Sequence, residues 1–108
     1  MNQQHTALVN RILMRFSARP ALSLFKMHTG VARALTGDYY VKYGILGGTD
    51  IIGILKPNGR WVAIEVKVGK DDLGPKQRHF RQLIEEHGGL YVLARDLSDV
   101  DVALTNAA

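Results

Sequence analysis

Two carboxylates and a lysine lie within otherwise apolar segments near the middle of the chain. Asp50 directly precedes the apolar run 51–55, and Glu65 and Lys67 are two residues apart within the run 61–68. Charged side chains are rarely left in such surroundings unless they are paired or bound to a metal ion. An Asp followed after fourteen residues by Glu-x-Lys is typical of a metal-dependent phosphodiesterase site. The spacing therefore predicts a nuclease.

A hairpin is expected to position these residues. Residues 56–59, Lys-Pro-Asn-Gly, predict a turn, because proline presets its φ and Asn-Gly tolerates positive φ. The flanking runs then pair as one hairpin over residues 50–68. Since side chains alternate between the two faces of a strand, the length of the turn decides which residues meet.

The register of this hairpin determines whether the charged residues share a face. A four-residue turn places Leu55 opposite Arg60 and therefore Asp50 opposite Glu65. A two-residue turn at the Asn-Gly pair instead places Asp50 opposite Lys67. Both registers leave the three charged residues on one face, whereas a turn of odd length would separate them.

Two carboxylates at cross-strand distance repel each other unless a cation lies between them. Mg²⁺ prefers hard oxygen ligands, and Asp50, Glu65 and the backbone carbonyl of Val66 are the predicted ones. The metal would polarise a phosphate oxygen and lower the pKa of a bound water. Lys67 would orient that water or stabilise charge on phosphorus. The alternative is that Asp50 merely ends a strand and Glu65 and Lys67 form a solvated edge pair.

A second element is expected to contribute an amide to this site. The run 75–87 predicts a helix that begins at Pro75 and stops at two glycines, with Phe80 and Ile84 on its buried stripe. Gln77 lies on the same stripe, so its amide should reach a water or a site residue; the alternative is an amide in solvent. Trp61 is predicted to pack in the core rather than to stack on bases.

The remaining elements predict a small mixed sheet flanked by helices, an α/β fold of the α+β kind. Helix 3–17 comes first, followed by strands at 22–27 and 39–43, with a break at Thr29-Gly30. Strand 90–94 follows a helix and should therefore lie parallel to its predecessor. Ser98 is expected to cap a last helix through about residue 106. Only three or four strands are expected before the second helix.

Composition is compatible with a nucleic-acid partner. The chain has 108 residues, which predicts one domain over 1–108, and a net charge of +4 permits binding to phosphate backbones. It has no cysteine, which excludes disulfides and zinc-thiolate sites. No signal peptide or membrane span is predicted, so a cytoplasmic protein is expected. Seven basic residues are candidate DNA contacts, each with a solvated face as the alternative: Lys26, Arg33, Lys42, Lys70, Lys76, Arg78 and Arg81.

Several motifs together resemble the VRR-NUC domain, the virus-type replication-repair nuclease branch of the PD-(D/E)XK superfamily. The resemblance covers roughly residues 3 to 100. It rests on Gly44-x-x-Gly47-x-x-Asp50-Ile51-Ile52-Gly53, Gly59-Arg60, Ile64-Glu65-Val66-Lys67, Pro75-x-Gln77-x-x-Phe80 and Gly88-Gly89. The segment 26–33 is similar to the one that precedes the site in stand-alone phage members.

The resemblance implies a PD-(D/E)XK fold and Mg²⁺- or Mn²⁺-dependent cleavage of DNA. By motif, Asp50 and Glu65 would bind the metal, Lys67 would be the catalytic lysine and Gln77 the helix glutamine. Members of the family often place a glutamate near the start of the first helix; here His5 or Gln4 would take its place.

The resemblance also suggests a phage- or prophage-encoded homodimer that cuts branched DNA, such as four-way (Holliday) junctions, in the bacterial cytoplasm. Two alternatives stay open. One is a catalytically weak or inactive DNA-binding module of the same fold, and the other is a structural protein associated with phage replication.

Overall fold

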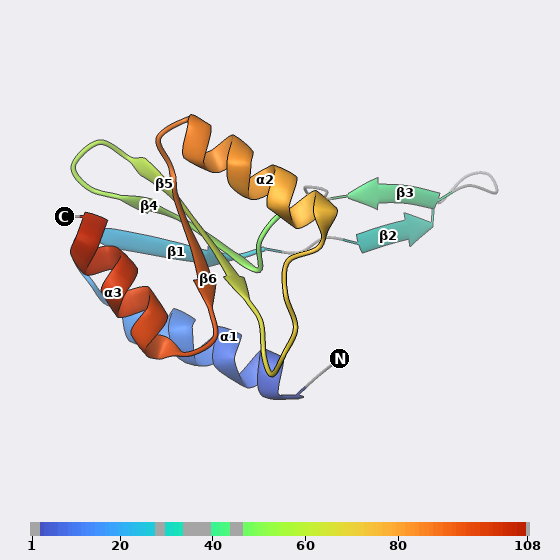
Figure 1. Ribbon diagram of the computed structural model, residues 1–108, viewed down its shortest axis with the longest axis horizontal. Helices are drawn as coiled ribbons and strands as arrows, with labels where there is room; N and C mark the ends of the chain where they lie inside the picture. Colours follow the sequence, from blue (N-terminus) through green and yellow to red (C-terminus); the bar gives the residue numbers. More distant parts are fainter. Residues whose placement is uncertain (1–2, 28–29, 34–39, 44–46, 108) are drawn as a thin grey trace.

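The computed structural model describes residues 3–27, 30–33, 40–43 and 47–107. Strands β1, β4, β5 and β6 form a four-stranded sheet in the order β1-β4-β5-β6, and β2 and β3 pair separately as an antiparallel ribbon beyond the end of that sheet (Figure 1). The elements in chain order are α1 (Gln3–Phe16), β1 (Leu22–Lys26), β2 (Gly30–Arg33), β3 (Tyr40–Tyr43), β4 (Ile51–Leu55), β5 (Arg60–Val66), α2 (Pro75–Glu86), β6 (Leu90–Ala94) and α3 (Leu97–Ala107).

The sheet is covered on both faces. Helices α1 and α3 pack on one face and α2 on the other (Figure 1). This is an α+β architecture with a mixed sheet between helices, which confirms the predicted fold class. Among the described helices, none is both long and apolar enough to cross a lipid bilayer.

The main core lies between the sheet and the helices α1 and α3. Apolar residues recur at four-residue spacing along α1, and Ile12 and Phe16 on that stripe are fully buried. On the other face, α2 packs Phe80 and Ile84 against the sheet, beside Tyr91. Both faces of β5 are therefore covered, and its residues 62 to 66 are all buried.

The hairpin β4–β5 has the register of a four-residue turn. Leu55 pairs with Arg60 and Ile51 pairs with Ile64 in antiparallel fashion. Gly59 closes the turn at a φ of 68°, a value that glycine adopts without steric cost. One step beyond the last pair, Asp50 is brought opposite Glu65. Strand β6 runs parallel to β5 after the crossover through α2, as predicted.

Three expectations about the elements were wrong. Gly30 begins strand β2 rather than ending a strand, while Thr29 and Gly44 lie outside the described residues. Consequently five strands, not three or four, precede α2. The cap of α3 is Asp96, whose Oδ1 accepts the Asp99 N–H at 3.1 Å and the Ser98 hydroxyl at 2.6 Å. Asp96 is preferred because its carboxylate can accept both donors.

Trp61 does not lie in the core. It is 43% exposed, on the face that α2 covers only in part. The pattern of the strand predicted which side of the sheet Trp61 occupies, but not how far along that side the helix extends.

Close approach of β1 and β4 at Gly53 makes this position sensitive to any side chain. A Cβ there would meet the Ser23 carbonyl oxygen and the Cδ2 atom of Leu24 well inside van der Waals contact. We expect Gly53→Ala to lower the free energy of unfolding by about 1–2 kcal/mol, as is usual for overpacking. Urea denaturation would measure it. Ile54→Ala, on the exposed next residue, is the control and should change stability much less.

Candidate functional site

Asp50 and Glu65 meet at the end of the β4–β5 hairpin. The Asp50 backbone N–H donates to Glu65 Oε1 at 3.2 Å. In the reverse direction, Asp50 Oδ2 accepts the backbone N–H of Val66 at 2.9 Å. These reciprocal bonds tie each carboxylate to the opposite strand. The hairpin register therefore brings the two acids together as predicted.

Glu65 is an unusual carboxyl group because it is 5% exposed. Burial raises its pKa, the negative charge of Asp50 raises it further, and Lys67 opposes these effects only in part; the pKa is about 8. In the absence of a cation, the protonated form of Glu65 is therefore favoured over a wider pH range than in an ordinary glutamate.

Lys67 and Gln77 both approach the same oxygen of Glu65. Lys67 Nζ lies 3.6 Å from Glu65 Oε2, and Gln77 Nε2 donates to that atom at 2.6 Å. The Gln77 side-chain oxygen accepts the Gly74 N–H at 3.0 Å, which fixes the amide at the first turn of α2. Gln77 thus faces inward and has a partner, as expected from its place on the apolar stripe.

The first helix contributes a histidine to the site. His5 Nε2 lies 3.3 Å from Asp50 Oδ2. The preceding residue, Gln4, is exposed. His5 is thus in contact with the carboxylates, and the role predicted for Gln4 stays a prediction.

The donor set suits a hard divalent cation. Within the described part of the chain, no group of three or more His, Cys, Asp or Glu residues could hold a metal ion. A cation here would therefore depend on Asp50 and Glu65, supplemented by carbonyl oxygens and water. Two carboxyl groups held together, one of them with a raised pKa, form a place where a cation would relieve repulsion. Val66 contributes its N–H to this arrangement, and its predicted role as a carbonyl ligand stays a prediction.

The seven basic candidates fall into three groups. Arg78 Nη1 donates to the Leu73 carbonyl, and Arg81 Nε lies 3.4 Å from Glu85 Oε1, so both have partners within the chain. Arg33 and Lys42 belong to the β2–β3 ribbon, and their side chains lie outside the description. The remaining three are exposed: Lys26, Lys70 and Lys76.

Tyr91 is a site neighbour that sequence reasoning missed. It is 6% exposed, and its hydroxyl has no hydrogen-bond partner among the described residues. Burial and then the negative charge of Glu65 raise its pKa, while Arg81, 5.3 Å from the ring centroid, opposes the change. Tyr91 pairs with Ala63 in the parallel register, which places it on the face of Glu65. Predicting that register would have identified it.

The role of Gln77 in holding Glu65 can be measured through stability. Gln77→Ala removes the bond to Glu65 and the bond to Gly74, so we expect a loss of about 1–2 kcal/mol in the free energy of unfolding. Gln82→Ala is the matched control on the same helix, because Gln82 is exposed and bonds only to the surface residue Glu86. Equal effects of the two substitutions in urea denaturation would contradict the buried contact.

Comparison with known proteins assigns no family to the chain: no protein-family model matches its sequence, and no curated protein shows significant similarity to it. The function is therefore argued from the geometry of the site.

Proposed function

We propose that the protein is a Mg²⁺- or Mn²⁺-dependent endonuclease that hydrolyses phosphodiester bonds in DNA. The observation that carries this proposal is the environment of Glu65. This buried carboxyl group contacts a second acidic residue, Asp50. Lys67 and Gln77 both approach its Oε2 atom. Structural ion pairs rarely place two acids together in a buried position, whereas sites for cations do.

Each residue has a defined role in this proposal. Asp50 and Glu65 would hold the cation, which supplies charge that polarises the phosphate and favours deprotonation of water. Lys67 would orient the attacking water or stabilise negative charge developing on the phosphate. Gln77 would keep Glu65 in one orientation, and His5 would do the same for Asp50. The resemblance to VRR-NUC nucleases supports branched DNA as the substrate and a homodimer as the active form.

The direct test is cleavage of an end-labelled four-way junction, with a linear duplex of the same length for comparison. Cleavage with Mg²⁺ or Mn²⁺ that stops on chelation would support the proposal. Since a symmetric junction is cut in pairs by a two-fold dimer, sedimentation should give a mass near twice 12.0 kDa. No cleavage of any branched DNA with either metal would refute the nuclease.

One observation favours a second candidate, a non-catalytic DNA-binding module. The first helix provides His5 rather than an acid beside Asp50, so the site has less negative charge than a full carboxylate cluster. Calorimetric titration of Mn²⁺ into wild type and Glu65→Ala separates the two. A nuclease should lose a metal site in the variant, whereas a pure binder should show no such site in either protein. The carboxylates lie together, so their geometry does not favour a protein in which they are merely solvated.

A further inference from the structure

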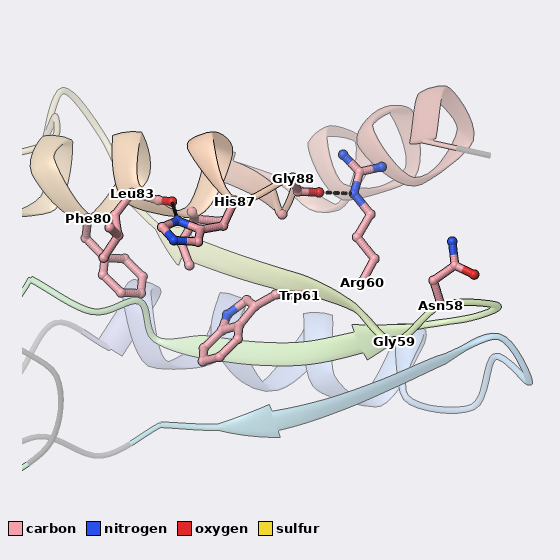
Figure 2. A pocket seen from close by; sticks show the side chains of 10 residues that line it. Asn58, Gly59, Arg60, Trp61, Phe80, Leu83, His87 and Gly88 are labelled. Carbon is pink, nitrogen blue, oxygen red and sulfur yellow. Dashed lines mark hydrogen bonds between the residues drawn. The ribbon is translucent and has the colours of Figure 1, made fainter.

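A groove separates the second half of α2 from the strand β5 beneath it. Its volume is about 810 Å³, within the range of small-ligand sites. The Trp61 indole lies on the strand side and faces the α2 side chains Phe80 and His87 (Figure 2). The lining is otherwise formed by Asn58, Gly59, Arg60, Leu83, Ile84, Gly88 and Gly89. None of these residues belongs to the Asp50–Glu65 site.

The groove opens on the same face of the sheet as that site. Trp61, Ala63 and Glu65 alternate along β5 and therefore point to one side. Glu65 lies four positions further along the strand than Trp61, about 13 Å at the usual rise per residue. Because Ala63 between them is buried with Phe80 and Ile84 of α2, a nucleic-acid strand with its phosphate at Glu65 would reach Trp61 by passing around the helix rather than along the strand.

The side chains that line the groove indicate which kind of ligand it would bind. Its ionisable side chains are Arg60 and His87, both basic, and none of the described residues that line it is acidic. Glu85 and Glu86 on the same helix are engaged by Arg81 and Gln82. Arg60 is held at the rim by a 2.8 Å bond from its Nε to the Gly88 carbonyl. An exposed indole beside basic groups matches a base with its phosphate, because bases stack on aromatic rings and phosphates attract cations.

We propose that this groove binds an unpaired nucleobase, which stacks on Trp61 while Arg60 and His87 face the adjoining phosphate. The inference rests on the proposed nuclease only for the position of the cut, since base binding would occur without cleavage. It adds to the proposed branched substrates a preference for DNA that carries unpaired nucleotides near the scissile bond. A fully paired duplex could not place a base in the groove without unstacking it.

The chain contains a single tryptophan, so indole fluorescence reports on this groove alone. The experiment titrates the whole protein, in chelator to prevent cleavage, with a short oligothymidylate and with a hairpin duplex of equal nucleotide number. We expect saturable quenching by the oligothymidylate and little quenching by the hairpin. By anisotropy of a labelled oligothymidylate, Trp61→Ala should bind about tenfold more weakly or worse, and Trp61→Phe should retain most of the affinity. Met14→Ala, 81% exposed on a helix across the sheet, is the control.

Three results would overturn the inference: oligothymidylate that binds without quenching, equal quenching by the hairpin, or no binding of either DNA. A change of emission with protein concentration in the absence of DNA would also overturn it. That result would mean that the exposed apolar residues Phe25, Ile54 and Trp61 contact a second copy of the chain. Junction cleavage in Mg²⁺ is measured separately. Cleavage without quenching would support the proposed nuclease and refute the base site. Quenching without cleavage would support the base site and refute the nuclease.

Discussion

Cleavage of a four-way junction should slow by at least about 100-fold when Lys67 is replaced by alanine, the usual cost of removing a group that stabilises transition-state charge. The Lys67 ammonium lies 3.6 Å from Glu65 Oε2, and its side chain is only 15% exposed. It therefore acts in a partly desolvated position, where a positive charge interacts more strongly than in water. Single-turnover cleavage at saturating Mg²⁺ would measure the effect on the chemical step.

Lys70→Ala is the matched control for this experiment. Lys70 is an exposed residue of the following loop, so its loss should affect binding of DNA more than the rate of the chemical step. Thermal melting of both variants would show that each is folded. Wild-type cleavage rates in both Lys67→Ala and Asp50→Ala would rule out the mechanism proposed for this site.

Stability of the metal-free protein should fall as pH rises from about 4.5 to about 8, because Glu65 has a folded-state pKa near 8 against an ordinary value of 4.5. A raised folded pKa means that the folded state binds more protons than the unfolded state in this window. The stabilisation is complete below the unfolded pKa and is lost as pH rises through the folded one. A tenfold difference in proton affinity between the two states corresponds to about 1.4 kcal/mol, so pKa values of 4.5 and about 8 correspond to a loss of up to about 5 kcal/mol.

Glu65→Gln tests the assignment of this pH dependence. The amide keeps the size of the side chain but cannot titrate, so urea denaturation across the window should give a nearly constant free energy of unfolding. A divalent cation should restore stability to the wild type most at the upper end of the window, where it competes with fewer protons. Equal pH slopes in the wild type and the variant would show that another group controls the dependence.

Much of the hairpin could be predicted from sequence because its determinants are local. A turn of even length within Lys-Pro-Asn-Gly leaves two registers, and in both of them period-two alternation assigns Asp50, Glu65 and Lys67 to one face. The inward position of Gln77 could be predicted from the helical periodicity and from the proline that begins the helix. Both inferences use spacings of a few residues, which the chain itself sets.

Features that depend on packing between distant segments could not be predicted in the same way. The exposure of Trp61 depends on where α2 lies across the sheet, and the position of Tyr91 beside Glu65 depends on the parallel register of β5 with β6. Strand β2 was missed because Gly30 is a residue that usually interrupts strands.

The continuous burial of β5 has a consequence for how the gene can vary. Five successive codons, 62 to 66, encode buried residues, so we expect most substitutions in this stretch to disturb packing. Val62, Ala63, Ile64 and Val66 are buried in the two hydrophobic clusters, so the volume of the core limits what can replace them. Glu65 would instead be retained for the chemistry of the proposed nuclease, at a cost to stability. A scan of all single substitutions would therefore separate Glu65 from its neighbours. At Glu65, some replacements should stabilise the protein and yet abolish function. At the neighbouring positions, function should be lost only when folding is lost.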